Sequence, residues 1–169
     1  MPEPFTTQWR EFIEECALLS EKFSFSRMHG RIVACLVLAP QPHLSSGELC
    51  ALLSVTKGAL SKELRIMVDE KILKKVLIPG QRSDYYTLSE HLWANRLSVL
   101  LPPLQASVDM IVRAKQMVDE SARPVNLEHL VEMYAYFKWR NEMQCRMIED
   151  WQDRRPQIIA ETRAYFKSL

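Results

Sequence analysis

Residues 45–88 read as two short helices followed at once by a β-hairpin. Ser45 and Glu48 have the spacing of a capping box, in which each side chain reaches the backbone N–H of the other residue. Thr56 follows a tight turn and is placed to cap the second helix. Residues 72–88 then alternate as strands do around a Pro-Gly turn, and they are the one β signal that we identify. This order predicts a winged helix-turn-helix, a mainly α fold with a small β-hairpin wing.

Helices are also expected before this segment. Apolar residues recur at helical spacing over residues 6–23, and residues 24–26 interrupt the pattern. A second helical pattern follows and ends before Pro40, because the residue that precedes a proline is disfavoured in the helical conformation. We therefore expect a helical pair to precede the helix-turn-helix.

After the hairpin, a long helical pattern runs over residues 89–121. Pro102 and Pro103 fall in its middle, so a kink or a break is required there. A final helix is expected to open near Asn126, and Pro156 should bend or end it.

Residues 56–69 form the second helix of the helix-turn-helix, and one of its faces is apolar. Leu60, Leu64 and Met67 recur at spacings of four and three, which places them along one face of a helix. We expect this face to pack on the first helix of the motif. It leaves a polar, lysine-bearing ridge for solvent or for a ligand.

The polar ridge has the chemistry of a DNA-reading helix. Its candidate DNA-binding residues are Thr56, Lys57, Gly58, Ser61, Lys62 and Arg65. In a major groove, Arg65 or Lys57 suits guanine O6 and N7. Gly58 allows a phosphate to approach the N-terminus of the helix, where free N–H groups and the helix dipole favour an anion.

The wing adds further positive charge. Its expected strands are residues 72–78 and 84–88, and the chain has no acidic residue from Lys71 to Arg82. The candidate DNA-binding residues of the wing are Lys74, Lys75, Gln81, Arg82 and Ser83. Arg82, beyond the Pro-Gly turn, is placed to enter a minor groove. We expect Asp84 to brace Arg82 by an ion pair.

Charge and hydropathy limit the class of protein. The chain has 22 Lys and Arg residues against 21 Asp and Glu residues, so it is not a general nucleic-acid coat protein. A basic stripe in a neutral chain indicates a localised anionic contact. No apolar run approaches the roughly 20 residues that span a bilayer, and the N-terminus lacks the features of a signal peptide. A cytoplasmic protein with no membrane partner is expected.

Cysteine and histidine do not form a recognisable site. The four cysteines are widely spaced, and the four histidines lack ligand spacing. We therefore expect no metal and no cofactor. No pairing of a Ser or Cys nucleophile with His, and no phosphate loop, is evident, so an enzyme is not expected.

The segment ELCALLSVTKGALSKELRIMVDEKILKKVLIPGQRSDYYTL resembles the DNA-binding core of the MarR superfamily of transcriptional regulators. Residues 27–31 (RMHGR), the wing over residues 79–86 and the segment LVEMYAYFKWRNEM resemble the branch typified by the repressor of glycine-betaine synthesis. The resemblance extends from about Trp9 to Trp151. Residues 27–31 and the wing are its most specific parts.

The resemblance implies a ligand-responsive homodimeric repressor that binds double-stranded DNA at a palindromic operator. The implied domains are a dimerisation helix (1–25), the winged domain (26–89) and a helical dimerisation region (90–169). Large aromatic residues at both ends of the chain independently suggest a partner that covers them. The candidate dimerisation residues are Phe5, Trp9, Phe12, Tyr134, Phe137 and Trp151. A small-molecule effector of choline type is also implied, with its binding residues unknown.

The sequence departs from the family pattern at two places. Ser54 occupies a turn position where such motifs often carry glycine, so we expect a positive φ and some strain there. Pro102 and Pro103 interrupt what the family has as a continuous dimerisation helix.

Two other functions remain open at this point. A winged helix can bind protein instead of DNA, with its basic ridge merely solvated. A thiol-based sensor built on Cys16 is the second alternative, although Glu14 and Glu15 are expected to raise the pKa of that thiol.

Overall fold

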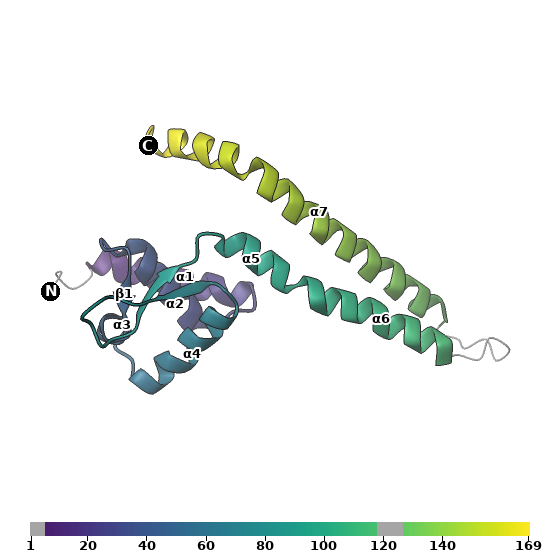
Figure 1. The fold of residues 1–169 in the computed structure, drawn as a ribbon, viewed down its shortest axis with the longest axis horizontal. Coiled ribbons are helices and arrows are strands. Elements are labelled where there is room, and N and C mark those ends of the chain that lie inside the picture. Colours follow the sequence, from purple (N-terminus) through teal and green to yellow (C-terminus); the bar gives the residue numbers. More distant parts are fainter. Residues whose placement is uncertain (1–5, 118–126) are drawn as a thin grey trace. The chain divides into compact units, whose positions relative to one another are not determined.

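The fold is given by a computed structural model that describes residues 6–117 and 127–169. The chain divides into two compact units, residues 1–92 and residues 93–169. In Figure 1 the purple-to-teal helices and the small sheet belong to the first unit, and the green and yellow helices belong to the second.

The helices of the first unit begin where the sequence predicts. They are α1 (Thr7–Lys22), α2 (Arg27–Leu38), α3 (Ser46–Leu53) and α4 (Lys57–Asp69). Each follows a hydroxyl side chain that accepts a hydrogen bond from a backbone N–H in the first turn, from Thr6, Ser26, Ser45 and Thr56. The capping box is confirmed, because the Ser45 N–H donates to Glu48 Oε2 at 2.7 Å and the Glu48 N–H donates to Ser45 Oγ at 3.1 Å.

The turn between α3 and α4 has the strained backbone that we expected. Ser54 ends α3 in the left-handed conformation, with φ 53° and ψ 43°. For a residue with a Cβ this conformation costs roughly 1–2 kcal/mol. Because the Ser54 N–H donates to Ala51 O and the Val55 N–H donates to Cys50 O, the turn still satisfies carbonyls at the end of α3.

The sheet contains a strand that the sequence analysis missed. The wing strands β2 (Leu73–Val76) and β3 (Tyr85–Leu88) are shorter than predicted, and β1 (Leu44–Ser45) pairs with β3 to give the order β1-β3-β2. All pairs are antiparallel. The prediction of the hairpin as the one β element is therefore wrong, because two residues are too few to show a period and β1 exists only through its distant partner.

The core of the first unit lies between its helices and the sheet. Its buried members come from α1, α2, α3, α4, the strands and the turn before β2: Ile13, Ile32, Ala34, Cys35, Leu44, Leu49, Leu60, Leu64, Met67, Ile72, Leu73 and Tyr86. The wing is thus anchored in the same core as the two helices of the motif.

The second unit consists of α5 from Trp93 onward, α6 and α7. Their bounds are α5 (Leu92–Val99), α6 (Leu101–Met117) and α7 (Leu127–Phe166). Helices α6 and α7 run side by side (Figure 1), with Leu104, Ile111 and Ile148 buried. Gln144 is also buried, and its Nε2 donates to Leu97 O at 3.2 Å.

The prolines of the second unit act differently. The predicted break at Pro102 and Pro103 is confirmed, since α5 ends at Val99 and both prolines lie in the first turn of α6. There a missing N–H removes no helical hydrogen bond. Pro156, by contrast, lies inside α7, which continues to Phe166 along a curved path (Figure 1). The helix does not end there, because a bend can accommodate the proline ring. The predicted boundaries at Ser121 and Asn126 lie outside the described residues.

Candidate nucleic-acid interface

Burial separates the two ridges of α4. Leu60 and Met67 are fully buried and Leu64 is 2% exposed, in the core that also contains Leu49 of α3. The residues expected to reach DNA are all exposed, namely Thr56, Lys57, Gly58, Ser61, Lys62 and Arg65. We call these six residues the α4 ridge. The apolar face therefore fixes the helix in the core and leaves the α4 ridge to solvent.

The N-terminus of α4 is open to a close approach. Thr56 Oγ1 accepts a hydrogen bond from the Ala59 N–H at 3.4 Å, and the first turn carries no acidic residue. Apart from its chain neighbours and the backbone of its own helix, no atom lies within 4 Å of the position that a Cβ on Gly58 would take. Free N–H groups at a helix N-terminus attract anions, so this end of the helix suits a backbone phosphate.

The wing also presents its predicted residues to solvent. Lys74, Lys75, Gln81, Arg82 and Ser83 are all exposed, and we call them the wing patch. The tip is a tight Pro-Gly turn, in which Gly80 has φ 80° and the Gln81 N–H donates to Ile78 O at 3.0 Å. Glycine is needed at this position because side chains rarely tolerate a positive φ. The turn places Arg82 next to the tip of the wing.

The expected ion pair of the wing has a different partner. Asp84 Oδ1 lies 2.8 Å from Lys75 Nζ, whereas we expected Asp84 to brace Arg82. The hydrogen bond that Lys75 donates to the Asp84 carboxylate raises the pKa of Lys75 above its ordinary value. The cause is register: Lys75 lies opposite Tyr86 on β3, so its side chain reaches Asp84 at the start of that strand. Asp84 thus offsets one of the charges of the wing patch.

A polar cluster on the inner side of α4 was missed by the sequence analysis. Ser26 Oγ donates to Glu63 Oε1 at 2.7 Å, and His29 Nδ1 lies 4.0 Å from the same oxygen. The His29 and Glu63 side chains are only 9% and 15% exposed. Glu63 follows Lys62 in the chain, and the surrounding basic residues gave no indication that it contacts another helix. No local signal relates it to Ser26, which lies 37 residues away.

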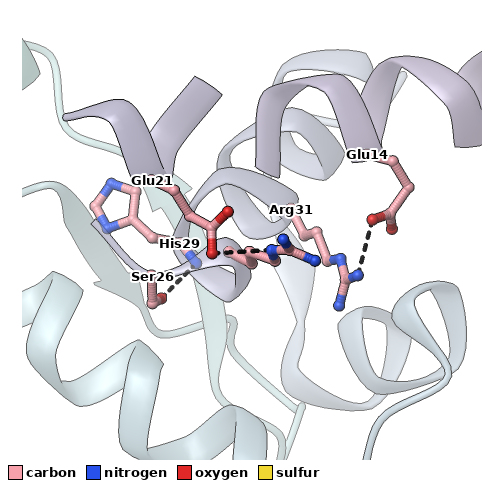
Figure 2. Close-up of polar contacts among 6 residues, drawn as sticks. Glu14, Glu21, Ser26, His29 and Arg31 are labelled. Atoms are coloured by element: carbon pink, nitrogen blue, oxygen red, sulfur yellow. Dashed lines mark hydrogen bonds and ion pairs between the residues drawn. The ribbon is translucent and has the colours of Figure 1, made fainter. Parts of the chain in front are cut away.

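The arginines of the RMHGR segment join α2 to α1. Arg31 donates to Glu14 Oε2 at 2.8 Å, and the Nε of Arg27 lies 2.9 Å from Glu21 Oε1. Figure 2 shows the Arg31–Glu14 contact beside the hydrogen bond that caps α2. The resemblance identified this segment without a role, and the contacts assign it to the packing of the two helices.

The thiols of Cys16 and Cys35 are poorly suited to redox chemistry. Burial and the nearby Glu15 carboxylate raise the pKa of Cys16, and burial raises the pKa of Cys35 to about 12. The four cysteines are free. Because the thiolate is the reactive form, a raised pKa lowers reactivity at neutral pH.

The candidate dimerisation residues lie in different environments. Phe12 and Tyr134 are exposed, and Trp9, Phe137 and Trp151 are partly buried, whereas Phe5 lies outside the described residues. An exposed apolar row on α7 went unrecognised as a unit in the sequence analysis. It consists of Tyr136, Trp139, Met143 and Met147, which are 39–57% exposed. We call these four residues the α7 stripe. Their spacings of three and four place them on one side of the helix.

The described residues include a surface pocket on α7. A pocket of about 350 Å³ on α7 is lined by His129, Glu132, Met133, Tyr136 and Phe137. Among residues 6–117 and 127–169, no group of three His, Cys, Asp or Glu side chains is arranged to hold a metal ion. Within the same described ranges, no helix combines the length and the apolarity needed to cross a bilayer.

The fold of the chain is similar to that of a solved protein structure. No family model matches the chain. A crystal structure of a transcriptional regulator superimposes with a TM-score of 0.72 at 19% sequence identity, covering 87% of this chain and 99% of that one. The chain shares the fold of a known transcriptional regulator. AbsC, a MarR family transcriptional regulator from Streptomyces coelicolor, aligns with a TM-score of 0.42 at 13% identity, over 80% of this chain and 86% of its own.

One curated protein matches in sequence. The HTH-type transcriptional regulator MmpR5 of Mycobacterium tuberculosis (strain ATCC 25618 / H37Rv) is 26% identical over 84 residues. The match covers 50% of this chain and 51% of that protein, so the chain spans about half the length of the curated relative that it matches.

Proposed function

We propose that this chain is a DNA-binding transcriptional regulator of the MarR superfamily, in the betaine-synthesis-repressor branch, which acts as a homodimeric repressor at an inverted-repeat operator. In this proposal the α4 ridge reads a major groove and the wing patch contacts the adjacent minor groove. The single observation that carries it is the division of α4: Leu60, Leu64 and Met67 hold the helix in the core while every residue of the α4 ridge is exposed.

The homodimer is the second part of the proposal. A two-fold dimer presents two recognition helices to one face of DNA, with half-sites about 34–36 Å apart or a multiple of that distance. The α7 stripe supports a partner chain, because contiguous exposed apolar rows of this kind are typical of interaction surfaces.

The test is a fluorescence-anisotropy titration against a labelled duplex taken from upstream of the gene for this protein. Binding should weaken linearly in log–log form with salt, with a slope of about 0.9 for each phosphate contacted. Arg65→Ala should weaken binding by about 1–3 kcal/mol, because a bidentate contact with a base is lost.

Arg163→Ala is the matched control, since Arg163 is an exposed cation near the end of α7. It should leave the affinity unchanged. Absence of salt-sensitive binding by the unmodified protein, or equal effects of the two substitutions, would argue against the proposal and in favour of a protein-binding winged helix.

The third part of the proposal is a response to a small-molecule ligand. The pocket on α7 brings Glu132 together with the rings of Tyr136 and Phe137. A carboxylate and aromatic faces suit an organic cation. Repeating the titration with an added quaternary ammonium compound tests this point, and an unchanged affinity would remove it.

A further inference from the structure

The proposed recognition helix is attached to the rest of the winged domain by a polar link as well as by its apolar face. Ser26 Oγ donates to Glu63 Oε1 at 2.7 Å, and the same hydroxyl accepts a hydrogen bond from the His29 N–H at 3.0 Å. One serine thus caps α2 and holds a carboxylate of α4. We call this arrangement the Ser26–Glu63 link.

The link places a carboxylate at the N-terminus of α2. The first turn of α2 contains no acidic residue, although its free N–H groups and dipole favour negative charge there. Glu63 supplies that charge from another helix, 37 residues along the chain from Ser26. The His29 ring, 4.0 Å from Glu63 through Nδ1, is itself held by stacking on Phe25 at a centroid distance of 4.2 Å.

The link lies away from the surface that would meet DNA. At 100° per residue, Glu63 falls on the flank of α4 that borders its buried face, whereas Lys62 and Arg65 fall on the exposed side. The burial of these side chains agrees, because Glu63 is only 15% exposed and both cations are exposed. Glu63 is therefore placed to act on α2 and not on a base.

We propose that Glu63 is a positioning residue that fixes the rotation of α4 through Ser26, and so allows the protein to distinguish its operator from other DNA. This inference rests on the proposed function. Direct readout needs side chains held in register with base edges, whereas non-specific binding needs only positive charge near phosphates. Loss of the link should therefore reduce specific binding and leave non-specific binding intact.

The sign of the effect separates this role from simple electrostatics. Glu63 is a negative charge on a helix that approaches a polyanion. If it acted through its charge alone, its removal would strengthen binding to every duplex. A positioning role predicts weaker binding to the operator duplex and unchanged or stronger binding to a scrambled duplex.

The experiment compares Glu63→Ala with Glu63→Gln in the full-length protein. Both variants lose the charge, but the Gln carbonyl oxygen can still accept from Ser26 Oγ. Affinity is measured for the duplex from upstream of the gene and for a scrambled duplex of equal length and composition. Glu63→Ala should lower the ratio of the two affinities about tenfold or more, and Glu63→Gln should restore most of it.

Asp69→Asn is the matched control, because Asp69 is an exposed acidic residue on the same helix. It should strengthen binding to both duplexes slightly and leave their ratio unchanged. Circular dichroism at the assay temperature must show that every variant is folded. If Glu63→Ala, Glu63→Gln and Asp69→Asn all behave alike, charge alone explains the result and the inference is overturned.

A measurement without DNA separates failure of the inference from failure of the proposed function. Amide hydrogen exchange in the first turn of α2 should accelerate in Glu63→Ala and stay near the unmodified rate in Glu63→Gln. If the unmodified protein does not discriminate between the duplexes, the proposed function fails and the positioning role with it, even where exchange confirms the link. Unchanged exchange in Glu63→Ala would overturn the link itself.

Discussion

Gly30 marks a place where two helices meet with no room for a side chain. A Cβ at this position would lie 2.8 Å from Ala17 Cα and would also meet Cys16 O and Ser20 Oγ. Ala17 is fully buried, and Ala34 on α2 is 2% exposed. Small residues on both helices therefore allow the backbones of α1 and α2 to approach closely. Arg27 and Arg31 of α2 then form ion pairs with glutamates of α1.

Gly30→Ala should lower the free energy of unfolding by about 1–3 kcal/mol, since the added methyl group must displace backbone atoms. Chemical denaturation followed by circular dichroism measures the change. Gly58→Ala is the control, because no atom lies within 4 Å of its Cβ position and alanine is the better helix former. Equal effects of the two substitutions would contradict the steric explanation.

The residues that were predicted correctly from sequence share one property. The caps at Ser45 and Thr56 depend on neighbours three residues away, so their spacing in the sequence is also their spacing in the helix. The Ser26–Glu63 link depends on how α4 packs on α2, and no local pattern reports that. The partner of Asp84 was mistaken for the same reason, because strand register and not proximity in sequence selected Lys75.

At the scale of elements, proline position decides how a helix responds. Pro102 lies in the first turn of α6, where its N–H would have no helical partner. Pro156 lies inside α7, where it removes a hydrogen bond to the carbonyl four residues earlier and its ring crowds that carbonyl. From the sequence, a kink or a break was expected at Pro102, and a bend or an end at Pro156. Only Pro102 lies at a helix boundary.

Pro156→Ala should raise the free energy of unfolding by about 1–3 kcal/mol, because the missing hydrogen bond is restored and the clash is removed. Thermal unfolding followed by far-UV circular dichroism provides the measurement. Pro102→Ala serves as the comparison and should change the transition little. A larger gain from Pro102→Ala would show that this account of the prolines is wrong.

At the scale of the whole molecule, the exposed α7 stripe is the feature that bears on assembly. Trp139 is 57% exposed and Met147 is 51% exposed, whereas Gln144 and Ile148 on the same helix are buried. We propose that a second copy of the chain covers them. The candidates chosen from sequence include Phe137 and Trp151, which the chain already buries in part. Aromatic content alone could not separate residues that pack internally from residues that await a partner.

Trp139→Glu should convert the proposed dimer to a monomer, because a charge placed in an apolar interface is strongly unfavourable. Size-exclusion chromatography with light scattering measures the mass. Val131→Glu is the control: Val131 is an exposed apolar residue of α7, five positions before Tyr136 and hence on the other side of the helix. If only Val131→Glu dissociates the dimer, the interface lies on the Val131 side of α7 and not at the α7 stripe.

The small sheet has a further consequence for the solution behaviour of the protein. The strand order leaves β2 at an edge, where unpaired backbone groups invite another chain to add a strand. Lys74 and Lys75 are exposed on that edge, and lysine is a residue that discourages such pairing. The wing cations proposed to contact DNA therefore also protect the protein against aggregation. A variant that lacks both lysines loses this protection, so weakened DNA binding by that variant is interpretable only for protein that remains monodisperse.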